Sequence, residues 1–234
     1  MTDSVYLRLA GPLQSWAKPA VTGNFVNTRE VPTESALRGL VAGALGHRRG
    51  EWPEWISSIE FVVREDKRPQ IVDDFHTIGS REDEFEFRRR LAILQGLSVR
   101  TAKSIAFKPG VGATVIARRT YLSDADFLVR MTLDGHTEEL DRAASDPVFS
   151  TYLGRKAFAA TFPFYLGVGN ADLINLIPVM REGTDAPKKI GVKLHFLGMG
   201  PTARPSQIGV PTVPDRAAWI DAVADLGLKR RCTL

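Results

Sequence analysis

The chain has 234 residues and a formal net charge of +4, and 44% of its residues are hydrophobic, which is typical of a globular protein. One cysteine, Cys232, excludes an intrachain disulfide and a zinc site built from several cysteines. No apolar run approaches the roughly 20 residues of a membrane span, and the N-terminus lacks the pattern of a signal peptide. We therefore expect a cytoplasmic protein without membrane contact. A mildly basic chain permits a nucleic-acid partner without requiring one.

The N-terminal segment predicts a half-buried strand, because apolar residues of Val5–Leu9 alternate with Tyr6 and Arg8. Gly11-Pro12 ends this strand, and a long loop follows over residues 13–32. This loop carries Gln14, Trp16 and Arg29, and an aromatic ring and a cation are side chains that can contact a nucleic acid.

A helix is predicted to follow Thr33, whose hydroxyl suits the N-cap position. Leu37 and Val41 belong to an apolar stripe with helical spacing, and Gly46 provides the stop. The alternating segment "IEFVVRED", residues 59–66, then predicts a second strand. The chain therefore opens in the order β-α-β.

Residues 78–113 show no regular pattern and are interpreted as an insertion, with an acid-free stretch that carries Arg100, Lys103 and Lys108. The next two strand-like runs, "TVIARRTYL" and "DFLVRMTL", are separated only by "SDA" and predict a β-hairpin. The run "TEELDRAASD" predicts a short helix with Thr137 as its N-cap.

Together with the strand-like "KIGVKLHFLG", these elements predict an α+β fold, a ferredoxin-like (RRM-like) β-α-β-β-α-β sandwich. We assign residues 1–77 and 114–200 to this domain and 78–113 to an inserted thumb. Residues 201–234 form a Gly/Pro-rich C-terminal extension that ends in a helix capped by Asp215.

The sequence offers little for catalysis by a metal or a nucleophile. The four histidines stand far apart, and none has a second His or Cys at ligand spacing. Nucleophile-elbow and phosphate-loop motifs are absent from the sequence, so we expect neither a metal nor another cofactor. One catalytic alternative stays open, which is metal-free RNA cleavage by His76 together with Tyr121 or Lys156.

Nucleic-acid binding has stronger support in the segment "YLGRKAF". Tyr152 offers a stacking face, Gly154 allows close backbone approach, and Arg155 and Lys156 offer cations to phosphates. The basic stretch of the insertion could neutralise further phosphates.

Five segments in this order resemble the CasD subunit family of type I-E CRISPR Cascade, in the RAMP superfamily: "LRLAGPLQSW", "PTESALRGLVAGALG", "DFHTIGSRED", "RRTYLSDADFLV" and "YLGRKAF". The resemblance implies a ferredoxin-like domain with a protruding thumb. It also implies a non-catalytic subunit of a hetero-oligomer that grips the 5′ handle of the crRNA and caps one end of the complex. The implied protein partners are the Cascade backbone subunit and the Cascade large subunit.

The matching segments imply RNA contacts at the loop of Gln14 and Trp16, at Thr33 and Ser35, and at His76 near the base of the thumb. Arg119 lies in the matching strand segment that re-enters the core. The loop of Tyr152, Gly154, Arg155 and Lys156 is the strongest candidate. Two departures are the long insertion and Phe158, where some relatives carry cysteine. Two alternatives remain: an endoribonuclease that processes CRISPR precursor RNA, and an assembly protein without intimate RNA contact.

Overall fold

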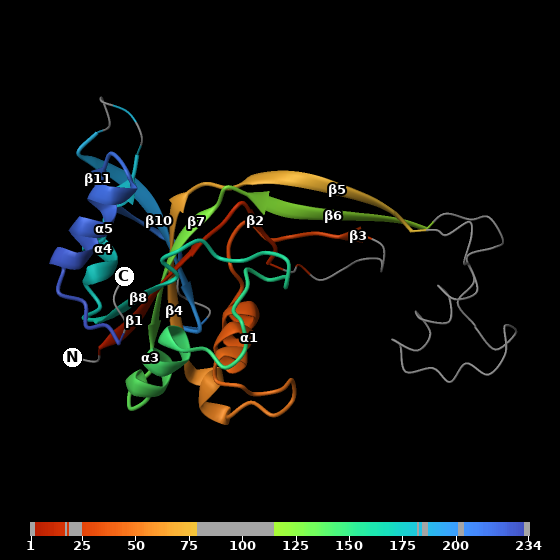
Figure 1. Cartoon of the computed structure of the whole chain (residues 1–234), viewed down its shortest axis with the longest axis horizontal. Helices are drawn as coiled ribbons and strands as arrows, with labels where there is room; N and C mark the ends of the chain where they lie inside the picture. The colour runs from red at the N-terminus through yellow and green to blue at the C-terminus, as the bar shows by residue number, and fades with distance from the viewer. Residues whose placement is uncertain are drawn as a thin grey trace, which may run out of the picture. The chain divides into compact units, whose positions relative to one another are not determined.

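The computed structural model describes residues 3–16, 18, 25–78, 115–181, 183, 187–200 and 204–231 (Figure 1). The chain divides into a larger unit, Met1–Lys18, Thr28–Val72 and Tyr121–Leu234, and a smaller unit, Pro19–Asn27 and Asp73–Thr120. The elements along the chain are β1 (Ser4–Ala10), β2 (Leu13–Gln14), β3 (Phe25–Val26), α1 (Glu34–Ala44), the 3-10 helix η1 (Glu54–Ser58), β4 (Glu60–Lys67), β5 (Gln70–Ile78), β6 (Val115–Ser123), β7 (Asp126–Thr132), α3 (Thr137–Ser145), β8 (Tyr165–Gly169), α4 (Leu173–Leu176), β9 (Val179–Met180), β10 (Lys189–Leu197), β11 (Ser206–Val213) and α5 (Arg216–Asp225).

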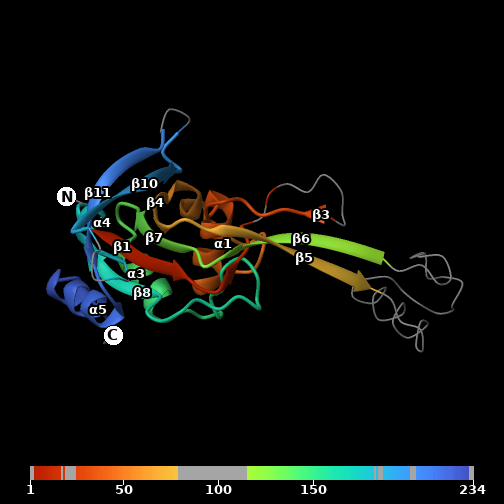
Figure 2. The same cartoon turned by 90° about the horizontal axis from the view of Figure 1, so that it is seen from above.

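The larger unit is built on a seven-stranded sheet with the order β8-β1-β7-β4-β10-β11-β9. Its neighbours are antiparallel except β11 and β9, which are parallel. Figure 2 shows β1 next to β7 and β8. Helices cover this sheet, so the predicted α+β class is confirmed.

Two helices, α1 and α3, cover one face of the sheet with an apolar core. Leu7 and Phe61 from the strands pack there with Leu37 of α1 and Leu140 of α3. Thr33 caps α1 as predicted, because its Oγ1 accepts a hydrogen bond from Ala36 N.

The predicted cap of α3 was wrong by one residue. His136 occupies the N-cap position, and Thr137 is the first helical residue. The Thr137 hydroxyl donates to the carbonyl oxygen of Asp3 over 3.2 Å. A tertiary contact therefore engages the hydroxyl that local sequence reasoning assigned to the cap.

The opposite face of the sheet is covered by α4 and α5. Tyr6, Val62 and Leu128 of the strands pack there with Trp219 and Val223 of α5. Strand β1 is thus buried along its whole length, and the prediction that it is half-buried was wrong. The residues that alternate with its apolar positions face this second layer rather than solvent.

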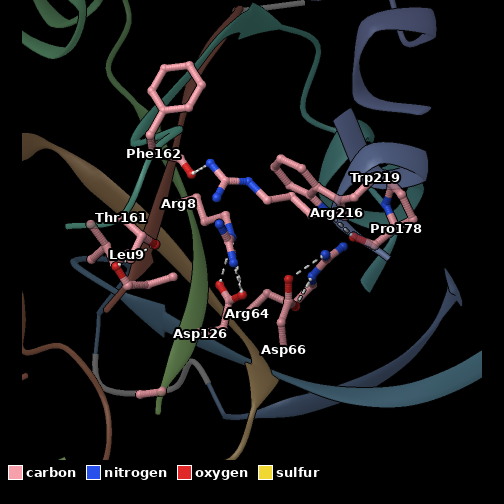
Figure 3. Close-up of polar contacts among 12 residues, drawn as sticks. Arg8, Leu9, Arg64, Asp66, Asp126, Thr161, Phe162, Pro178, Arg216 and Trp219 are labelled. Atoms are coloured by element: carbon pink, nitrogen blue, oxygen red, sulfur yellow. Dashed lines mark hydrogen bonds and ion pairs between the residues drawn. The ribbon is translucent and has the colours of Figure 1, made fainter. Parts of the chain in front are cut away.

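This second layer also contains two buried ion pairs (Figure 3). Arg8 donates from Nη2 to Asp126 over 2.6 Å, and the guanidinium carbon of Arg8 lies 5.2 Å from the ring centroid of Trp219. The side chain of Arg64 is completely buried and donates twice to the carboxylate of Asp66. The polar residues of the strands are therefore paired under the C-terminal helices.

The predicted hairpin between residues 114–122 and 126–133 was wrong. β7 pairs with β1 and β4 in the large sheet, whereas β6 belongs to a second sheet with β2, β3 and β5. Asp124, with φ +54°, lies in the short connection between them. The connection therefore changes sheets instead of closing a hairpin.

The strand that follows α3 in the large sheet also differs from the expected one. β8 lies beside β1, whereas β10, the segment "KIGVKLHFLG", pairs with β4 toward the other edge. The short, glycine-containing β8 shows little of the alternation that marks a strand in sequence, because its residues 165–168 are all buried.

The smaller unit contains paired strands from three separate parts of the sequence. β3 pairs in parallel with β6 through Phe25 opposite Arg118 and Val26 opposite Arg119, and β5 also pairs with β6. Among the described residues, none of the helices has the length and apolar run that a membrane crossing requires.

Candidate nucleic-acid interface

Two segments of the larger unit are hydrogen-bonded to each other: residues 11–16, which contain the two-residue strand β2, and the loop of residues 152–158. We call them the two-loop site. Ser15 N donates to Leu153 O over 3.0 Å. Gly154 has φ +84°, and a Cβ added to it would lie 1.7 Å from the carbonyl oxygen of Ser15. Only glycine fits this position. The close backbone approach expected of Gly154 is made to the chain's own loop.

The first loop is fixed by the side chains of Gln14 and Trp16. Gln14 is fully buried, and its Nε2 donates to the carbonyl oxygens of Leu9 and Ala125 over 2.9 Å each. Its Oε1 accepts from Trp16 Nε1 over 3.1 Å, and Trp16 is 1% exposed. Both side chains are therefore engaged inside the fold, where RNA cannot reach them without a rearrangement, and we do not propose them as direct ligands.

The second loop holds Arg155 in a defined position. Arg155 Nη1 donates to the hydroxyl of Tyr121 over 2.8 Å, and its guanidinium carbon lies 5.3 Å from the centroid of the same ring. Phe158 meets Tyr121 edge-on, with 5.0 Å between ring centroids. Because Tyr121 is buried, its ring and hydroxyl hold the guanidinium of the partly exposed Arg155 in one position and so orient the remaining N–H donors of Arg155.

Two neighbours of Arg155 extend the site at the surface. Tyr152 is 39% exposed, and Lys156 is exposed. An aromatic ring and two cations therefore lie within five consecutive residues of one loop. This combination suits a single-stranded nucleic acid, whose bases stack on aromatic rings while phosphates meet cations.

The backbone of Arg29 is tied to the first loop, since Arg29 N donates to Trp16 O over 2.7 Å and Trp16 N donates to Thr28 Oγ1 over 2.8 Å. The side chain of Arg29 is exposed. The structure thus joins Arg29 to the two-loop site. Thr33 uses its hydroxyl as the cap of α1, and Ser35 is exposed in the first turn of that helix.

The remaining candidates belong to the smaller unit or lie outside the described residues. His76 Nδ1 lies 2.9 Å from Asp74 Oδ1, and both side chains are partly exposed. Arg119 is partly buried in β6. Arg100, Lys103 and Lys108 lie outside the residues that the structure describes.

One ion pair of the smaller unit was not anticipated from the sequence. Arg118 donates to both carboxylate oxygens of Asp73, over 3.2 and 2.6 Å. The hydrogen bonds from Arg118 lower the pKa of Asp73 below its ordinary value. Asp73 is therefore an ionised partner of Arg118. The described residues contain no cluster of three or more His, Cys, Asp or Glu that could hold a metal.

Sequence reasoning missed the supporting residues of the two-loop site. In the sequence, Tyr121 is considered as a catalytic group and as part of a matching strand segment, Ser15 only as part of the matching first loop, and Phe158 only as a departure from the family. Thr28 is not considered. The contacts of Tyr121 and Thr28 join segments far apart in the chain. The only available signal was the expected match of "RRTYLSDADFLV" and "YLGRKAF" to one family.

Comparisons with known proteins give a consistent result. The family model described as CRISPR-associated protein (Cas_Cas5) matches residues 4–220. The CRISPR system Cascade subunit CasD of Escherichia coli (strain K12) is 32% identical over 218 residues, covering 84% of this chain and 86% of that protein. These matches confirm the resemblance inferred from the five sequence segments.

Solved structures agree with this result. One, described as "CRISPR RNA-guided surveillance complex", has a TM-score of 0.72 and 26% identity, covering 95% of this chain and 98% of the other. A second, described as "Crystal structure of Cas protein", has a TM-score of 0.55 and 23% identity over 91% of this chain and 98% of that one, and supports the fold. The chain belongs to the CRISPR-associated protein (Cas_Cas5) family.

Proposed function

We propose that this chain is a non-catalytic subunit of a Cascade-type CRISPR surveillance complex and that its two-loop site binds the 5′ handle of the crRNA. The observation that carries the proposal is Arg155 held against Tyr121, with Tyr152 and Lys156 exposed beside it. Similarity to the CasD subunit and to a chain of a surveillance complex supports the assembly.

The site suits a positioning contact rather than base reading. Arg155 retains donors for phosphate oxygens beyond the one that meets Tyr121. Contacts to phosphates fix register and orientation, while an RNA-guided complex reads sequence by base pairing. In this proposal the subunit caps one end of the backbone-subunit filament and contacts the large subunit, and the complex serves antiviral defence.

We also interpret the larger unit as containing a ferredoxin-like domain. The elements β1, α1, β4, β7, α3 and β8 follow one another in the order β-α-β-β-α-β. Their strands have the spatial order β8-β1-β7-β4 and are antiparallel. Residues 78–113 are the inserted thumb of this interpretation.

The experiment replaces Arg155 and Lys156 by alanine and measures binding of a single-stranded handle RNA to the full chain. We expect on the order of tenfold weaker binding and a salt slope reduced by about 1.4, because two phosphate contacts are lost. Assembly with the backbone and large subunits should also weaken. The matched control is the Arg48→Ala, Arg49→Ala pair, two adjacent exposed cations outside the two-loop site.

Handle affinity and assembly equal to those of the control pair would refute the proposed site. The same preparation tests the endoribonuclease alternative, since repeat RNA should stay intact in EDTA. The contact between His76 and Asp74 is of the kind that orients a general base. Cleavage that disappears in His76→Ala would therefore replace the non-catalytic proposal.

A further inference from the structure

Residues 228–231 run along the outer edge of β8, and we call them the strap. β8 is an edge strand of the seven-stranded sheet, with β1 on its inner side. Val168 N donates to Lys229 O and Lys229 N donates to Val168 O, over 2.8 Å each. This reciprocal pair is an antiparallel bridge. The strap therefore occupies the side of β8 on which a further strand could pair.

The side chains of the strap join it to three elements. Arg230 Nε donates to Leu166 O of β8 over 2.7 Å, and Arg230 Nη2 donates to Val223 O of α5 over 3.1 Å. Arg231 Nε donates to Asp141 of α3 over 2.5 Å. Figures 1 and 2 show β8 between α3 and α5. The strap is therefore anchored to the edge strand and to a helix on each face of the sheet.

A glycine of β8 makes room for the strap. Gly167 has φ +126°, and a Cβ added to it would lie 2.7 Å from the carbonyl oxygen of Lys229. Glycine inside a strand often marks a place where another backbone approaches closely. At Gly167 the approaching backbone is that of the strap, so the sequence of β8 is adapted to this cover.

The sequence of β8 offers little protection of its own. The strand, "YLGVG", contains neither a charged residue nor a proline, and these are residues that keep edge strands from pairing with other molecules. A register shift opposite Tyr6 and Leu7 is one protective feature. At the opposite edge of the sheet, β9 is protected by its length of only two residues. For β8, the strap supplies the cover.

The outer part of the strap is held at the surface. Lys229 Nζ lies 3.5 Å from Asp3 Oδ2, and the side chain of Lys229 is 81% exposed. The side chain of Arg231 is 44% exposed. Leu228, in contrast, is buried in the cluster that contains residues of α5. Because exposed ion pairs contribute little to stability, residues 229–231 can detach while Leu228 stays packed.

We propose that the strap is a latch on a self-association surface. When residues 229–231 detach, the outer edge of β8 pairs with the same edge of a second copy of this chain. Two copies of one strand that pair antiparallel are related by a two-fold axis, and both use the same surface. β8 suits this pairing because it places no like charges opposite each other. The two-loop site takes no part in this surface.

The test releases the strap in the full chain and measures the molecular mass in solution by analytical ultracentrifugation. Arg230→Ala, Arg231→Ala removes the side-chain anchors of the strap. Lys229→Pro instead removes the N–H that donates to Val168 O. Both variants should form dimers, with twice the mass of one copy, at concentrations where we expect the original chain to be monomeric.

The matched control is Arg48→Ala, Arg49→Ala, which removes the same charge from two adjacent exposed residues and should leave the mass unchanged. Handle RNA provides a separate arm, since both strap variants should bind it as the original chain does. The latch and the proposed function can therefore fail separately.

Proline at position 168 tests whether the dimer forms through β8. Val168 N donates to the strap, so Val168→Pro removes a donor from the outer edge of the strand. Added to Lys229→Pro, it should return the protein to a monomer. Hydrogen exchange gives a second readout, because the Val168 amide of the Arg230→Ala, Arg231→Ala variant should exchange at least about tenfold faster than in the original chain when both are dilute.

Three results would overturn the inference. They are a monomeric mass for both strap variants, dimers that Val168→Pro leaves intact, and loss of the folded state in both strap variants, measured by circular dichroism. The second result would place the self-association surface elsewhere on the molecule. The third would make the strap a part of the core instead of a latch.

Discussion

The two faces of the seven-stranded sheet are buried by different physical means. Under α1 and α3 the layer is mainly apolar, with Phe61 and Leu37 in one cluster, and it contains a buried hydrogen bond, from the Tyr165 hydroxyl to Asp141 of α3. Under α4 and α5 the strands also carry Arg8 and Arg64, each paired with a carboxylate. Apolar burial stabilises without direction, whereas an ion pair requires one geometry. The C-terminal layer is therefore positioned more by the geometry of its ion pairs than by the apolar area that it buries.

Arg64 illustrates this difference. Besides Asp66, its Nη1 donates to the carbonyl oxygens of Ile174, inside the four-residue helix α4, and of Ile177, the C-cap of that helix. Carbonyl groups at a helix end have no partner within the helix. Arg64, a residue of β4, therefore donates hydrogen bonds to carbonyl groups of α4 and its C-cap.

The largest expected effect comes from Arg64→Met. Removing Arg64 leaves the Asp66 carboxylate buried without a partner, so the free energy of unfolding should fall by about 3–5 kcal/mol. Urea denaturation of the full chain measures this change. The double variant Arg64→Met, Asp66→Leu should recover part of the loss.

A matched experiment on the apolar face is Phe61→Ala, which should cost about 3–5 kcal/mol by loss of burial and formation of a cavity. A second truncation, at a residue that packs in the same cluster as Phe61, should lower the free energy of unfolding further and never raise it. If the Arg64, Asp66 double variant is no more stable than Arg64→Met alone, the distinction between the two faces does not hold.

A smaller effect is expected from pH. Burial raises the pKa of Asp66 to about 6 from an ordinary value of 3.8, against the opposing effect of Arg64. Between these values the folded chain holds a proton that the unfolded chain does not, so this group's contribution to stability falls as the pH rises from about 4 to about 6.

Urea midpoints of the original chain and of Asp66→Asn, compared across that pH range, isolate this contribution. The difference between the two proteins should vary with pH in the stated direction. A pH-independent difference would mean that Asp66 has its ordinary pKa in the folded chain, because the attraction of Arg64 offsets the effect of burial.

The smallest effects concern the helix caps above the two faces. Asp215 Oδ1 accepts from Ala218 N over 2.9 Å at the start of α5, while Thr33 Oγ1 accepts from Ala36 N over 3.4 Å at the start of α1. We expect Asp215→Ala to cost about 1 kcal/mol and Thr33→Ala to cost less. Thermal unfolding of both variants gives the order, and the reverse order would show that cap geometry does not govern these helices.

The parts of the fold set by local sequence were predictable. Thr33 and Asp215 were identified as caps from residue type and position, and both make the expected hydrogen bond. The burial of β1 on both faces was not predictable, because it depends on α5, more than 200 residues later in the chain. Likewise, the short connection "SDA" indicates a hairpin, yet the two strands that it joins, β6 and β7, belong to different sheets.

Motif order indicated a candidate loop whose RNA contacts stay a prediction, and the sequence did not show how this loop is constructed. Motif order pointed to the loop of Arg155 and Lys156. The sequence could not reveal that Gly154 accommodates Ser15, or that Tyr121 holds Arg155, since each contact joins distant segments. The prediction of one loop over residues 13–32 was wrong, since Gln14 belongs to the short strand β2 and β3 lies in the same range. The burial of Gln14 and Trp16 depends on partners that composition does not identify.

The position of β1 in the sheet has a consequence for how the protein folds during its synthesis. This strand leaves the ribosome well before its neighbour β8 and its cover α5 are synthesised. Domains fold as units during synthesis, so Tyr6 stays exposed until α5 has emerged. A nascent chain stalled before Arg216 would display an uncovered apolar sheet, which makes incomplete copies of this subunit natural clients for chaperones and proteases.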